Sequence, residues 1–151
     1  MPSWKIHEKY SRLMNIPINI AREINRFVDD PKWRDFFDSA LKRYETPSLR
    51  ALGGCIIIYN FRSALLHTSA YEQFRQYIEV YGENGFRVFF LHMILDLIER
   101  NTRSGKEFAF LKVEDVDGFY KEYIEEVNDF LNNRMDEVLA DIKNYIQSRR
   151  R

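Results

Sequence analysis

The fold of this chain is decided by one stretch, Phe86–Arg100, which reads FRVFFLHMILDLIER. In a helix, with about 100° between successive residues, apolar side chains would cover most of its circumference. The remaining narrow arc would carry polar side chains: His92, Asp96, Glu99 and Arg100. A helix that is apolar on nearly all sides is normally buried. The stretch therefore predicts a central helix against which the rest of the chain packs.

Outward from this segment, apolar residues keep the three- and four-residue spacing that is typical of helices. Helices are predicted over six further segments: Ser3–Met14, Asn19–Asp29, Asp30–Tyr44, Thr46–Leu66, Ala70–Val80 and Asp117–Ser148. The predicted fold class is all-α, an irregular helical bundle of about six helices with a long C-terminal helix, in a single domain spanning residues 1–151.

Two glycine-containing segments affect this prediction. Gly82–Gly85 is expected to end the helix before the central one. Gly53 and Gly54 precede Cys55–Tyr59, where clustered β-branched residues make a strand the alternative. Helix is preferred there because no other segment shows the period-2 alternation of a partner strand.

The C-terminal helix carries a prediction about assembly. If Asp117–Ser148 is one continuous helix, it is about 45 Å long. That length exceeds the diameter of a compact domain of this size. Part of its apolar side is therefore expected to contact a second chain, which predicts a homo-oligomer or a protein partner.

Composition limits the classes of function. The 23 Lys and Arg residues balance the 23 Asp and Glu residues, so the chain has no overall basic field that would attract nucleic acid. Its single cysteine, Cys55, excludes an internal disulfide and a cysteine-based zinc site. The N-terminus lacks a signal-peptide pattern, and no apolar run reaches the about 18 residues of a membrane span. A cytoplasmic protein is expected.

The three histidines are the first candidates for chemistry because imidazole titrates near neutral pH. They are His7, His67 and His92, and His92 shares a helix face with Asp96, four residues later. The leading interpretation of that pair is a solvated surface contact on a charged stripe. The alternative is a metal or acid–base site between facing helices. Asp29–Asp30, Asp35 and Asp38 could suggest a carboxylate cluster, but they are interpreted as the acidic charge that is expected at helix starts.

One resemblance rests on two short motifs. The opening Met1–Trp4 followed by His7 resembles the start of zinc-dependent phospholipase C-like helical hydrolases, and Leu91–Asp96 resembles their His-x3-Asp metal-ligand motif. In that family, His and Asp side chains on several helices bind zinc, which activates water against a phosphodiester. The resemblance implies a reduced site for one zinc or other divalent ion, with four candidate ligands: His7, His67, His92 and Asp96.

A second resemblance competes with the first. Arg62–His67 has the R-x4-H form of HEPN-type RNases, which are small α-helical domains, and Ser63 matches their usual polar residue after the Arg. The resemblance implies that Arg62 stabilises the charge of an RNA phosphate and that His67 transfers a proton, usually across a dimer. The same spacing recurs in Arg87–His92, with an apolar residue in the second position.

The sequence thus supports two classes of function. The leading prediction is a helical domain that acts through self-association or protein binding, by its C-terminal helix and its aromatic surface. The alternative is a phosphodiester-cleaving hydrolase, either a metal-dependent His/Asp enzyme or a metal-independent HEPN-type RNase. Convergence of the histidines within roughly 5–6 Å would favour the metal-dependent enzyme.

Overall fold

The computed structural model describes residues 4–30, 76, 78–105 and 118–150 of the chain. Within these residues it contains five helices and no strand. They are α1 (Trp4–Leu13), α2 (Ile18–Val28), α7 (Gly82–Arg103), α8 (Gly118–Asn132) and α9 (Met135–Arg149). The all-α fold class predicted from the sequence is confirmed. The helices expected over 30–66, the strand alternative at Cys55–Tyr59 and most of the helix expected over Ala70–Val80 lie outside the described residues.

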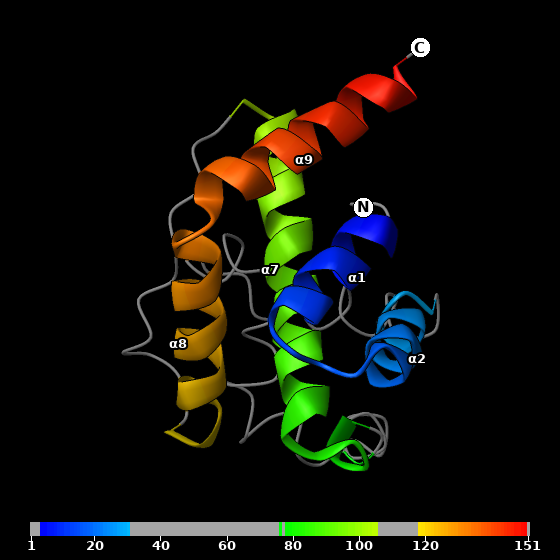
Figure 1. Ribbon diagram of the computed structural model, residues 1–151, viewed down its shortest axis with the longest axis vertical. Helices are drawn as coiled ribbons and strands as arrows, with labels where there is room; N and C mark the ends of the chain where they lie inside the picture. Colours follow the sequence, from blue (N-terminus) through cyan, green and yellow to red (C-terminus); the bar gives the residue numbers. More distant parts are fainter. Residues whose placement is uncertain (1–3, 31–75, 77, 106–117, 151) are drawn as a thin grey trace, which may run out of the picture.

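The predicted central helix is α7. It contacts each of the other four described helices, and Figure 1 shows α8 alongside it while α9 crosses its C-terminal end. Its buried apolar residues lie on all sides, from Phe86 and Val88 to Ile98. They form one cluster with apolar side chains of the other described helices. Burial of this stretch is therefore what holds the described helices together.

The first turn of α7 corrects one prediction. Gly82–Gly85 was expected to lie between the preceding helix and a central helix that starts at Phe86, but α7 already begins at Gly82. Gly82 has a φ of +64°, a backbone conformation that glycine adopts at no steric cost. At Gly85, a β-carbon would collide with the backbone carbonyl oxygen of Ile78. The two glycines therefore form a tight corner into α7.

A Schellman motif separates α1 from α2. Asn15 adopts a left-handed φ of 59°, and its N–H donates to the carbonyl of Arg12 at 2.9 Å. The N–H of Ile16 donates to the carbonyl of Ser11 at 3.0 Å, and the Ile16 side chain is buried. Asparagine tolerates this conformation better than most residues. Pro17 then precedes the first turn of α2, whose buried face carries Ala21, Ile24, Asn25 and Val28.

The prediction of one continuous C-terminal helix is wrong, because the chain breaks between α8 and α9. The N–H of Arg134 donates to the carbonyl of Leu131 at 3.0 Å, a three-residue step that tightens the last turn. Asn132 and Asn133 occupy this turn, and asparagine is a weak helix former because its side chain competes for backbone hydrogen bonds. The break lets the apolar sides of both helices pack into the same core. The length argument for a second chain therefore fails, and self-association stays a prediction.

Two polar contacts fix α9 against α1. Asp141 of α9 accepts a hydrogen bond from the hydroxyl of the buried Tyr10 and another from Lys9, both at 2.7 Å.

None of the described helices is both long enough and apolar enough to cross a bilayer.

Candidate metal centre

The candidate site is centred on His92, whose side chain is completely buried in the middle of α7. Asp96 lies one turn later on the same helix, with its Oδ2 3.1 Å from His92 Nε2. Its side chain is 23% exposed, so the carboxylate lies at the solvent side of the site. The sequence alone does not decide whether the polar stripe of α7 faces solvent or the protein interior. In the structure, the stripe is buried at His92. The leading interpretation of a solvated surface pair is wrong.

Helix α2 supplies a side chain to each ring nitrogen of His92. Asn25 Oδ1 lies 2.9 Å from His92 Nδ1, and Asp29 Oδ1 lies 3.1 Å from His92 Nε2. Because an amide oxygen only accepts, His92 Nδ1 carries a proton and donates a hydrogen bond to Asn25 Oδ1. Asn25 and Asp29 are four residues apart and so lie on the same side of α2.

Helix α1 supplies His7, which stacks on His92 with ring centroids 4.1 Å apart and planes 8° from parallel. His7 lies on the buried side of α1 with Ile6, Tyr10 and Ser11. Its Nε2 is 3.3 Å from Asp96 Oδ1. The consecutive helices α1 and α2 therefore bring polar side chains to the same point of the distant helix α7.

The electrostatics of the site separate the two histidines. Burial opposes a charge on His92, but the carboxylates of Asp96 and Asp29 outweigh it and raise the His92 pKa to about 9. Burial, together with the charge on His92, lowers the pKa of His7 below its usual value. Burial alone would raise the pKa of Asp96, whereas His92 and His7 lower it well below the usual carboxyl range. These pKa shifts favour a charged His92, a neutral His7 and an ionised Asp96.

Several buried polar atoms of the site have no hydrogen-bond partner among the described residues. They are Nδ1 and Nε2 of His7, Oγ of Ser11, Nδ2 of Asn25, Oδ2 of Asp29 and Oδ1 of Asp96. Each unsatisfied buried polar group costs about 1–3 kcal/mol. Such a concentration of unsatisfied groups around two imidazoles is what a site built for a ligand would retain.

The donor atoms have the spacing that a metal ion needs. One ligand atom from each of His7, His92 and Asp96 lies within 4.8 Å of the others. Tetrahedral zinc with bonds of about 2.0–2.1 Å keeps its ligand atoms about 3.3 Å apart. His7 Nε2 lies 3.3 Å from Asp96 Oδ1 and His92 Nε2 lies 3.1 Å from Asp96 Oδ2, so each separation is close to that value but involves a different oxygen of Asp96.

Of the four predicted metal ligands, His7, His92 and Asp96 are brought together. His67, the fourth, and Arg62, its predicted catalytic partner, lie outside the described residues. Sequence reasoning missed Asn25 and Asp29. Asn25 could have been found as the one polar residue among the buried positions of α2.

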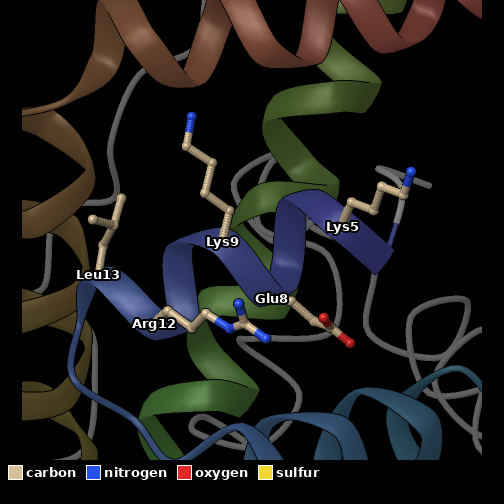
Figure 2. Close-up of a pocket in the computed structure, with 5 residues that line it drawn as sticks. All are labelled: Lys5, Glu8, Lys9, Arg12 and Leu13. Carbon is tan, nitrogen blue, oxygen red and sulfur yellow. The ribbon is translucent and has the colours of Figure 1, made fainter.

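A separate hollow lies on the opposite side of α1, with a volume of about 470 Å³. Figure 2 shows the side chains that line it: Lys5, Glu8, Lys9, Arg12 and Leu13. Two of its charges are already paired, since Glu8 binds Arg22 at 2.8 Å and Lys9 binds Asp141 at 2.7 Å. The hollow contains none of the candidate metal ligands.

Comparison of the chain with protein-family models, with curated proteins and with solved structures found no significant match.

Proposed function

We propose that this chain is a metal-binding protein that holds one divalent transition-metal ion, of which zinc is the prototype, through His7, His92 and Asp96. One observation carries the proposal. His7 is only 2% exposed, and neither of its ring nitrogens makes a hydrogen bond within the described residues, while Nε2 lies 3.3 Å from Asp96 Oδ1, an ion pair only if His7 is protonated. Metal coordination would stabilise a neutral imidazole in such a place, because it engages one ring nitrogen directly.

The charges of the site support a cation. A divalent ion would replace the proton that His92 Nε2 shares with the carboxylates of Asp29 and Asp96. It would bring two positive charges to a place where these carboxylates already surround an imidazole. Carboxylate and imidazole together are ligands that zinc and neighbouring first-row ions accept.

Binding requires one local movement. In the stacked arrangement the two ring planes are nearly parallel, so their lone pairs do not converge on one point. Because a metal binds imidazole in the ring plane, His7 has to tilt relative to His92 when the ion enters. The unsatisfied nitrogens of His7 give up no hydrogen bond to a described residue in that tilt.

The test is direct metal titration. Protein purified without a polyhistidine tag is stripped with a chelator and titrated with zinc in a calorimeter. One zinc per chain is expected to bind the wild type, and His7→Ala is expected to weaken binding at least about 100-fold, since a ligand should cost no less than an outer-shell partner. Arg12→Ala, on the exposed side of the same helix, serves as the control and should bind like the wild type. Wild-type protein that takes up no metal would refute the proposal.

A second candidate function is hydrolysis of a phosphodiester at this ion. Asp96 is 23% exposed and Asp29 is 14% exposed, so the site has a side that reaches solvent. A zinc ion bound there would supply a water molecule of lowered pKa. Chelator-sensitive cleavage of bis-p-nitrophenyl phosphate, lost in His7→Ala and kept in Arg12→Ala, would support this function. Zinc binding without any cleavage would leave a structural metal site.

A further inference from the structure

The relation of α2 to His92 bears on how the proposed ion is held. Asn25 and Asp29 lie one turn apart and contact opposite nitrogens of the same ring. Asn25 holds the Nδ1 proton, which leaves Nε2 as the nitrogen that can bind a metal. Asp29 lies on that Nε2 side, where the ion would enter.

Asp29 and Asp96 lie equally close to His92 Nε2. Asp29 Oδ1 is 3.1 Å from His92 Nε2, the same separation that Asp96 Oδ2 shows. Two ligand atoms of one tetrahedral zinc are about 3.3 Å apart. The second oxygen of Asp29 is buried and has no hydrogen-bond partner within the described part of the chain. Asp29 therefore lies beside Nε2 with an oxygen to spare, but it is outside the group of His7, His92 and Asp96 whose donor atoms all lie within 4.8 Å of one another, so it has to move closer to become a ligand.

The place of Asp29 in its helix gives an independent reason. Asp29 is the C-cap of α2: its backbone N–H donates to the carbonyl of Asn25, and the N–H of Asp30 donates to the carbonyl of Phe27, both at 3.2 Å. The C-terminal end of a helix carries partial negative charge, which disfavours a carboxylate there. In the metal-free protein the charged His92 offsets that repulsion, and an ion that displaced the His92 proton would take over this role.

We propose that Asp29 is a fourth ligand to the ion, so that two imidazoles and two carboxylates from α1, α2 and α7 surround it. This inference rests on the proposed function, because it concerns the same ion. The buried and unsatisfied His7 is the separate observation that a ligand belongs at this point. The two carboxylates balance the charge of a divalent ion, and zinc can still take a water as a fifth ligand.

The experiment compares three chains: the wild type, Asp29→Asn, and the control Asp30→Asn. The control removes the same charge one residue away, at a side chain that is exposed. Each chain is titrated with zinc alone and then with cobalt(II), whose visible absorption reports the number and geometry of its ligands. Circular dichroism checks that each variant is folded, and Asp29→Ser provides a second variant should the amide fail to fold.

Asp29→Asn is expected to weaken zinc binding more than about 100-fold, beyond the 10–100-fold loss that is typical of an outer-shell partner. Its cobalt(II) spectrum is expected to change in shape and intensity, whereas Asp30→Asn should match the wild type in both measurements. A variant that keeps the wild-type cobalt spectrum, whatever its affinity, would show that Asp29 is not a ligand. A wild-type chain that binds neither ion would refute the metal site itself, which distinguishes the two failures.

Discussion

His7 of α1 and His92 of α7 stack face to face, with ring centroids 4.1 Å apart, although 85 positions (92 − 7) separate them in the chain. Two charged imidazoles in that arrangement would repel each other, and the opposite directions of their pKa shifts reflect this. His92 takes the charge because it faces two carboxylates, and His7 remains neutral. His7 makes no hydrogen bond to a described residue through either nitrogen, although its Nε2 lies 3.3 Å from Asp96 Oδ1. An aromatic ring without nitrogens would keep the stacked position and lose only that contact.

The first prediction follows from that difference. His7→Phe keeps a stacked ring and removes two unsatisfied nitrogens, so we expect the free energy of unfolding of the metal-free protein to change by less than about 1 kcal/mol. Zinc binding should be lost. Urea unfolding with and without a chelator measures both effects. A loss of several kcal/mol in the metal-free protein would show that His7 has a structural role.

The second prediction concerns His92. His92→Ala would leave Asp29 and Asp96 without the positive charge between them. Breaking a buried charge pair costs about 3–5 kcal/mol, so we expect His92→Ala to destabilise the metal-free protein by about 3 kcal/mol or more. The urea midpoint, compared with that of His7→Phe, measures this difference. Equal stability of the two variants would contradict the charge distribution described for the site.

The third prediction concerns metal and thermal stability. An ion that binds only the folded protein stabilises it by about 2.7 kcal/mol at a concentration one hundred times its Kd. For a chain of this length that corresponds to a rise in melting temperature of about 5–10 °C. Zinc should produce this rise, a chelator should reverse it, and His7→Phe should not show it. Magnesium at the same concentration is the control ion, because it prefers oxygen ligands and retains its water.

The fold was predictable where the helical spacing of apolar residues within one segment determines how that segment packs. Phe86–Arg100 gave the central helix because its apolar residues leave only a narrow polar arc. The break between α8 and α9 was not predictable in the same way. The three- and four-residue spacing of apolar residues continues across Asn132 and Asn133, and the break contains neither proline nor glycine. Only the packing of both helices on the core requires the turn.

The candidate site was predictable only in part. His92 and Asp96 share a helix face, so their proximity follows from local geometry alone. The contribution of His7 came from a resemblance, which the comparisons leave untested. Asp29 contacts His92 across 63 residues, and no local pattern indicates which helix packs on which. The one local sign at Asp29 was an acidic residue at the C-terminal end of a helix, where the partial negative charge of the helix disfavours a carboxylate.

The fourth prediction concerns the contact between α1 and α9 and its dependence on pH. Burial tends to raise the pKa of Asp141, but hydrogen bonds from Lys9 and Tyr10 outweigh it and lower that pKa. A carboxyl whose pKa is lower in the folded state contributes stability above the usual carboxyl pKa of about 4, and this contribution is lost as pH falls further. Asp141→Asn should therefore cost about 1–2 kcal/mol at pH 7 and less at pH 2–3. Asp129→Asn, an exposed carboxylate of α8, should show little change at either pH.

The last prediction tests the corner that opens α7. A β-carbon at Gly85 would collide with the carbonyl oxygen of Ile78, which is backbone and cannot move aside without shifting the turn. Gly82 has a positive φ, but a β-carbon there would meet nothing within 4 Å. Gly82→Ala should therefore cost only the left-handed strain of about 1–2 kcal/mol, whereas Gly85→Ala should cost more, because overpacking moves the start of the central helix. Urea unfolding of the two variants measures the order. If Gly85→Ala were as stable as the wild type, α7 would not begin in this corner, and the correction to the sequence-based boundary would be wrong.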